Sequence, residues 1–117
     1  MSLADGLDKY RNALENLKGV QKEPAQRQQQ AALDVLAARD AVQHLIKDVS
    51  SIPATQLIQL DELDCHLRKQ KTWIFNTIDV EHWRSLANPP EQSWWWHEPP
   101  ALAPFLEKRY RWLDRLD

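Results

Sequence analysis

The chain has 117 residues and a formal net charge of −2, and no long segment departs far from neutrality. It therefore lacks the basic patch with which proteins neutralise phosphates, and we expect no nucleic-acid partner. Its single cysteine excludes an internal disulfide and suits a reducing compartment. Only two glycines are present, and helix-forming residues fill the first 87 positions, which indicates one helical domain.

The first segment predicts a helix over about residues 3–18. Its apolar residues alternate at spacings of four and three over two heptads. They are Leu3, Leu7, Tyr10, Leu14 and Leu17. A small bundle need not cover such a seam completely, so we expect a homodimer.

Gly19 and Pro24 indicate the break before a second helix, over about 24–49. The apolar seam of this helix contains two small alanines, Ala31 and Ala38, which allow a close approach of a neighbouring helix. It consists of Ala31, Val35, Ala38, Val42, Leu45 and Val49. The stretch from Ser50 to Pro53 then predicts a turn.

A third and longest helix is predicted over about 54–87, where Asn88, Pro89 and Pro90 must end it. Its apolar side consists of Leu57, Leu60, Leu63, Leu67, Ile74 and Ile78. Residues 71–83 are rich in β-branched and aromatic residues, so a strand is the alternative there. We prefer the helix because the sequence offers no partner strand.

The polar residues of this third helix indicate no catalytic or metal site. Cys65 and His66 are adjacent and point about 100° apart on a helix, and no second cysteine or paired-histidine motif supports them or His82 as ligands. We expect a structural cysteine. Asp64 and Arg68 stand at the spacing of an exposed helical ion pair, as part of a solvated face. We therefore expect no enzymatic activity and no cofactor.

Three consecutive tryptophans, Trp94 to Trp96, lie between two proline pairs. Neither a helix nor a strand places three consecutive side chains on one face, so another surface must cover them. A folded-back loop that plugs the end of the bundle is one hypothesis, and an aromatic cage for a cation or sugar is a second. The third is a membrane interface, where tryptophan is enriched.

The stretch 101–117 predicts a short amphipathic helix with an apolar stripe and a basic surround. Together with the tryptophans it forms our candidate interaction or membrane-interface surface. This surface consists of Trp94, Trp95, Trp96, Phe105, Arg109, Arg111, Trp112 and Arg115. No glycine, asparagine or proline closes the helix, which is the pattern expected where a chain continues.

The combination NPP, WWW, PP and FLEKRYRWLDRLD resembles the segment just ahead of the first transmembrane helix in a group of uncharacterised bacterial membrane proteins with helical N-terminal cytoplasmic regions. The resemblance covers about residues 86–117. It implies a cytoplasmic domain at the inner face of a membrane. The charged N-terminus does not fit a signal peptide, and no run of 18 apolar residues occurs in this sequence.

We therefore predict an all-α fold. Residues 1–87 should form an antiparallel three-helix bundle or a long helical hairpin, and residues 88–117 a Trp/Pro-rich loop and the amphipathic helix. The expected function is a non-enzymatic interaction or oligomerisation domain of a membrane-anchored bacterial protein. The alternative is a soluble adaptor or signalling module that binds a partner helix through the tryptophan-rich surface.

Overall fold

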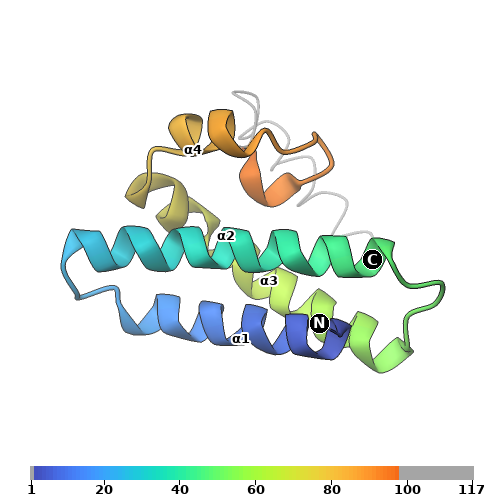
Figure 1. Cartoon of the computed structure of the whole chain (residues 1–117). Helices are drawn as coiled ribbons and strands as arrows, with labels where there is room; N and C mark the ends of the chain where they lie inside the picture. The colour runs from blue at the N-terminus through green and yellow to red at the C-terminus, as the bar shows by residue number, and fades with distance from the viewer. Residues whose placement is uncertain (1, 98–117) are drawn as a thin grey trace, which may run out of the picture.

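The computed structural model describes residues 2–97, and every regular element in that range is helical (Figure 1). The elements are α1 (Leu3–Gly19), α2 (Ala25–Lys47), α3 (Ala54–Thr77), α4 (Val80–Ala87) and the short 3-10 helix η1 (Trp94–Trp96). The all-α prediction is confirmed for this part of the chain, and the strand alternative for 71–83 is wrong. The predicted C-terminal amphipathic helix lies outside the described residues.

Helix α1 begins with a capping box. The Ser2 hydroxyl accepts a hydrogen bond from the Asp5 amide at 3.2 Å, and the Asp5 carboxylate accepts one from the Ser2 amide at 3.4 Å. Each side chain thus satisfies a backbone donor that a helix start leaves without a partner.

Helices α1 and α2 run antiparallel beside each other, and α3 crosses them at an angle (Figure 1). Gly6, near the start of α1, lies against the last turns of α2: a Cβ atom at this position would come within 2.5 Å of Leu45 Cδ1. The missing side chain therefore permits a close approach of the two helices.

The apolar seam of α1 is buried by contacts within this chain. Leu7, Tyr10 and Leu17 are completely buried and Leu14 is nearly so. The expectation that this seam leaves apolar surface for a second copy is wrong, because α2 and α3 both pack against α1. The homodimer itself stays a prediction, but the α1 seam cannot be its interface because that seam is buried in the single chain.

Helix α2 buries a wider stripe than its predicted seam. The buried residues are Ala31, Ala32, Val35, Leu36, Arg39 and Val42. The stripe is wide because α2 lies between neighbours and contacts α1, α3 and η1. Val49 was predicted to belong to the seam, but it lies beyond the end of α2 and is exposed.

The predicted helix over 54–87 is interrupted at Ile78 and Asp79, so a single long helix is wrong. Ile78 has extended backbone angles and a buried side chain. The Asp79 carboxylate accepts a hydrogen bond from the His82 amide at 3.2 Å and so caps α4. An aspartate that caps a new helix start competes with continuation of the old helix.

The start of α3 also departs from the prediction. Leu57 is 48% exposed and Ile58 60% exposed, while the core begins at half-buried Leu60 and continues through Leu63 and Leu67. The first turns of α3 therefore lie outside the core.

Helix α4 ends where the sequence predicted. Asn88 adopts a left-handed conformation with a φ of 46°, and its amide donates to the Arg84 carbonyl at 2.8 Å. The prolines that follow cannot extend the helix. The chain then turns back and places η1 against α2 and α3 (Figure 1).

Candidate interaction surface

The three tryptophans form one turn of 3-10 helix, which has about three residues per turn. Their side chains therefore leave the backbone in three directions, and each meets a different environment. Trp95 is 2% exposed and Trp96 is 5% exposed, whereas Trp94 is half-buried. The surface that covers the run belongs to α2 and α3.

Asp40 of α2 holds the two buried indoles. Its Oδ1 atom accepts hydrogen bonds from Trp95 Nε1 at 2.7 Å and from Trp96 Nε1 at 2.9 Å, and Oδ2 lies 2.9 Å from Trp96 Nε1. A buried indole N–H needs an acceptor, and a carboxylate can serve two donors at once. One half-buried carboxylate thus satisfies both tryptophans.

Two cationic side chains donate hydrogen bonds to backbone carbonyls of η1. Lys71 Nζ of α3 donates to the Trp94 carbonyl at 2.8 Å, and Arg84 Nε of α4 donates to the Trp96 carbonyl at 2.9 Å. Arg84 Nη2 is buried and has no hydrogen-bond partner within residues 2–97. These contacts tie α3, α4 and the tryptophan turn together.

Cations also lie over the rings. The Arg68 guanidinium carbon is 4.5 Å from the centroid of Trp94, and that of Arg39 is 4.2 Å from the centroid of Trp95. Trp94 packs edge-on against Trp95. The face of Trp95 on which an external cation could stack is therefore already occupied by Arg39.

The expected exposed surface is corrected for Trp95 and Trp96, which are core side chains in the described structure. They are buried because segment 88–97 folds back onto α2, where Asp40 supplies the acceptor that both indoles require. Trp94 retains partial exposure. The five remaining candidate residues lie outside the described residues: Phe105, Arg109, Arg111, Trp112 and Arg115.

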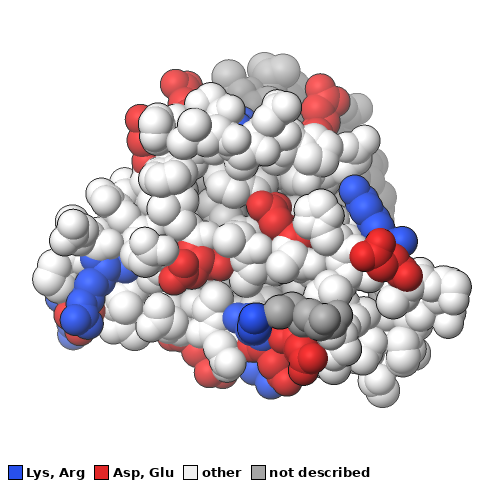
Figure 2. All heavy atoms as spheres, viewed as in Figure 1, with Lys and Arg blue, Asp and Glu red and all other residues white. Residues whose placement is uncertain are grey.

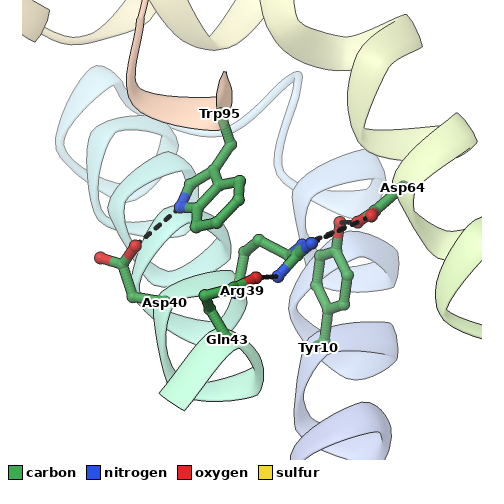
Figure 3. Close-up of polar contacts among 6 residues, drawn as sticks. All are labelled: Tyr10, Arg39, Asp40, Gln43, Asp64 and Trp95. Atoms are coloured by element: carbon green, nitrogen blue, oxygen red, sulfur yellow. Dashed lines mark hydrogen bonds and ion pairs between the residues drawn. The ribbon is translucent and has the colours of Figure 1, made fainter. Parts of the chain in front are cut away.

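A second polar cluster connects the three long helices inside the core (Figure 3). Arg39 of α2 and Asp64 of α3 form a two-point ion pair, with Nε to Oδ1 at 2.9 Å and Nη2 to Oδ2 at 3.2 Å. The Tyr10 hydroxyl of α1 donates to Asp64 Oδ1 at 2.7 Å, and Arg39 Nη1 donates to Gln43 at 3.2 Å. Asp64 is therefore not part of a solvated face, and the predicted surface pair of Asp64 with Arg68 is wrong.

This cluster favours the neutral form of Tyr10. Burial, then the negative charge of Asp64 and the hydrogen bond to it, raise the pKa of the Tyr10 phenol well above its ordinary value of 10.0. The phenol therefore stays a proton donor to Asp64. Because every group of the cluster is bonded to another, its role is to hold the helices in register.

The remaining sequence candidates lie on exposed helix surface. Cys65 is a free, exposed cysteine, so it is not a packed core residue, and His66 beside it is also exposed. His82 is exposed and contacts the Trp83 ring at 5.3 Å. Among residues 2–97, no group of histidine, cysteine and carboxylate side chains is arranged to hold a metal ion.

Two shallow hollows border these elements. One, of about 260 Å³, lies between α1 and α3, with Leu14 and Leu63 among charged residues of both signs. The other, of about 240 Å³, lies beside Asp40 and is lined by Lys47, Pro89 and Ser93 among others. Their mixed charges favour no single class of ligand.

Exposed large apolar side chains occur in two stretches of the described chain. Val49, Leu57 and Ile58 belong to the α2–α3 turn and the start of α3, and Trp83 and Leu86 belong to α4. On the face drawn in Figure 2, the region of α4 and η1 is largely uncharged, with acidic groups at its margins. These stretches, rather than the whole tryptophan run, offer apolar surface for contacts.

Within residues 2–97 no helix combines the length and apolar character that a bilayer crossing requires. Comparison of the chain with models of known families, with curated proteins and with solved structures found no match.

Proposed function

We propose that this chain is a non-enzymatic helical interaction domain and forms the cytoplasmic N-terminal part of a membrane-anchored bacterial protein. One observation carries the proposal: apolar side chains remain outside the core at two separate places, while the buried ionisable groups are bonded to one another. In this proposal Arg39, Asp64 and Tyr10 stabilise the fold, and the exposed apolar stretches bind partner molecules.

In this proposal α1, α2 and α3 act as an antiparallel three-helix bundle, and residues 88–117 connect it to the membrane. The antiparallel course of α1 and α2 supports the first part. The second part is supported by the resemblance of residues 86–117 to a juxtamembrane segment. Segment 88–97 also packs on the bundle, so the connection is firmly attached to it.

Self-association is proposed through the start of α3. Leu57 and Ile58 are adjacent, exposed and apolar, and they replace the α1 seam as the surface for a second copy. The adaptor alternative is less well supported, because two of its three tryptophan anchors are buried.

Sedimentation of the 117-residue chain at micromolar concentration tests the proposed dimer. We expect about twice the monomer mass for the wild type and the monomer mass for a variant with Leu57→Ser and Ile58→Ser. A matched variant with Ser at the exposed residues Trp83 and Leu86 should remain dimeric. A wild type that is monomeric throughout the range would remove oligomerisation from the proposed function.

A further inference from the structure

Arg39 of α2 has contacts with two different parts of the structure. Its Nε atom donates to Asp64 Oδ1 of α3 at 2.9 Å, and its guanidinium carbon lies 4.2 Å from the ring centroid of Trp95 in η1. Only 5% of Arg39 is exposed. One buried cation therefore belongs both to the polar cluster of the long helices and to the tryptophan turn.

These contacts form one continuous series that joins η1, α2, α3 and α1 (Figure 3). Trp95 donates to Asp40 of α2 and lies against Arg39 of the same helix. Arg39 in turn bonds to Asp64, which accepts from the Tyr10 hydroxyl of α1. Chains of packed and hydrogen-bonded side chains of this kind can carry energetic coupling between distant parts of a protein.

Trp95 shields the ion pair on the side of the tryptophan turn. The η1 turn lies against α2 and α3 after the chain has turned back beyond α4 (Figure 1). Trp95 itself is 2% exposed, and its ring covers Arg39. An ion pair is stronger where water is kept away, because the effective dielectric constant is lower. If the turn is displaced, water reaches the guanidinium group and its attraction to Asp64 weakens.

From this arrangement we propose that the attachment of segment 88–97 and the packing of the three long helices are coupled through Arg39, so that the tryptophan turn acts as a latch on these helices. With the turn in place, Trp95 keeps Arg39 dry and positioned for Asp64. With the turn displaced, the ion pair loosens. The proposal requires neither the membrane attachment nor the dimer, and it adds a regulatory property: an event that displaces segment 88–97 weakens the packing of α3 on α1 and α2.

The turn can be loosened experimentally at a point away from Arg39. Arg84 belongs to α4, and its Nε atom donates to the Trp96 carbonyl at 2.9 Å. It therefore holds the backbone of the turn, whereas Arg39 lies against the ring of Trp95. A substitution at Arg84 should reach Arg39 through the turn.

Hydrogen exchange of the Arg39 Nε–H group, followed by NMR in the isotope-labelled 117-residue chain, measures this effect. Arg84→Met removes the bond to the Trp96 carbonyl and keeps a long side chain. We expect exchange at Arg39 to become at least about threefold faster, since a charged hydrogen bond to the turn is lost. Leu86→Ser, at a side chain of the same helix that is 66% exposed, is the control and should leave the rate unchanged. An Arg39 rate that Arg84→Met does not alter would overturn the proposal.

A pair of substitutions at Trp95 separates the ring contact from the hydrogen bond to Asp40. Trp95→Phe and Trp95→Leu both lose the indole N–H, but only phenylalanine keeps an aromatic ring beside Arg39. The Arg39 Nε–H group should exchange roughly two- to thirtyfold faster in the leucine variant than in the phenylalanine variant. Equal rates would contradict coupling through the ring. Circular dichroism identifies a variant that no longer folds, and the Arg84 and Tyr10 variants then decide, because they leave Trp95 in place.

Coupling between two sites is reciprocal, so a change in α1 should also affect the tryptophan turn. Tyr10→Phe removes the hydroxyl that bonds to Asp64 and should make the Trp95 Nε1–H group exchange at least about twofold faster. Leu14→Ala, at a buried side chain of the same helix, is the control for a general loss of stability. It should affect the Trp95 rate less than Tyr10→Phe does, because Leu14 is not part of the series. A larger effect of Leu14→Ala would show that the indole exchanges through unfolding of the whole domain, and would rule out the latch.

The latch and the proposed function can fail independently. A chain that is monomeric in sedimentation, or that does not bind lipid vesicles, still has these exchange rates to compare. Unlinked exchange at Arg39 and Trp95 would remove the latch and leave the proposed interaction domain in place.

Discussion

Trp95 donates a 2.7 Å hydrogen bond from its indole nitrogen to the carboxylate of Asp40, which lies 55 residues earlier in the chain. The same carboxylate accepts from Trp96. Segment 88–97, which contains Pro89 and Pro90, is thereby joined to α2 through one acidic side chain. This hydrogen bonding explains how the surface of α2 can cover both Trp95 and Trp96.

Replacing Asp40 by alanine should lower the free energy of unfolding by about 2–6 kcal/mol, since two buried indole donors lose their acceptor at about 1–3 kcal/mol each. Asparagine should cost less, because its carbonyl oxygen still accepts a hydrogen bond. Urea unfolding followed by fluorescence provides the measurement. Asp34→Ala is the matched control on the exposed part of α2, and an equal loss there would show that Asp40 has no special role.

Breaking the buried pair of Arg39 and Asp64 should be strongly destabilising. Arg39→Ala leaves the Asp64 carboxylate without its cation, and we expect a loss of about 3–5 kcal/mol in the free energy of unfolding. A triple variant with Arg39→Met, Asp64→Leu and Tyr10→Phe removes the whole polar cluster. It should be more stable than Arg39→Ala in chemical denaturation, and a less stable triple variant would contradict this account.

Stability should fall at high pH because of Tyr10. Below pH 10 the phenol is protonated in both the folded and the unfolded chain. Above pH 10 the unfolded chain releases this proton, while the raised pKa of Tyr10 keeps it bound in the folded state. The free energy of unfolding should therefore decrease by up to about 1.4 kcal/mol per pH unit from this group.

The Tyr10→Phe variant isolates that effect. Its stability should be about 0.5–2 kcal/mol lower than that of the wild type near pH 7, because the hydrogen bond to Asp64 is lost. The difference from the wild type should then shrink as the pH rises above 10. Unfolding curves between pH 7 and pH 11 measure both quantities, and parallel profiles for the two proteins would refute the assignment.

The leucines of α3 should differ sharply in their contributions. Leu67 is completely buried and Leu63 nearly so, and alanine at either position should cost about 2–5 kcal/mol. Leu57→Ala should change the free energy of unfolding by less than about 0.5 kcal/mol in dilute, monomeric protein, because its side chain is half-exposed. Thermal unfolding of the three variants makes the comparison, and similar losses at all three would place Leu57 in the core.

Local chemistry was enough to determine the helical class and most of the chain breaks. Gly19 and Pro24 flank the first break, Pro53 closes the second, and Asn88 with its prolines ends α4. The prolines act on their own backbone through a missing N–H, and Asn88 acts through a tolerated left-handed conformation. The break at Asp79 also has a local cause, because Asp79 caps the start of α4. The sequence pattern did not reveal this break because apolar residues continue at helical spacing on both sides of it.

Tertiary structure decided which polar residues lie inside. Asp64 stands among charged residues and suggests a solvated face, yet α3 crosses α2 so that this carboxylate meets Arg39, 25 residues away. Trp95 and Trp96 can likewise be buried because Asp40 of α2 accepts hydrogen bonds from both indoles. A spacing of 3.6 residues places side chains on a common face, but it carries no information about which neighbour that face meets, because the crossing of helices is fixed by packing over the whole core.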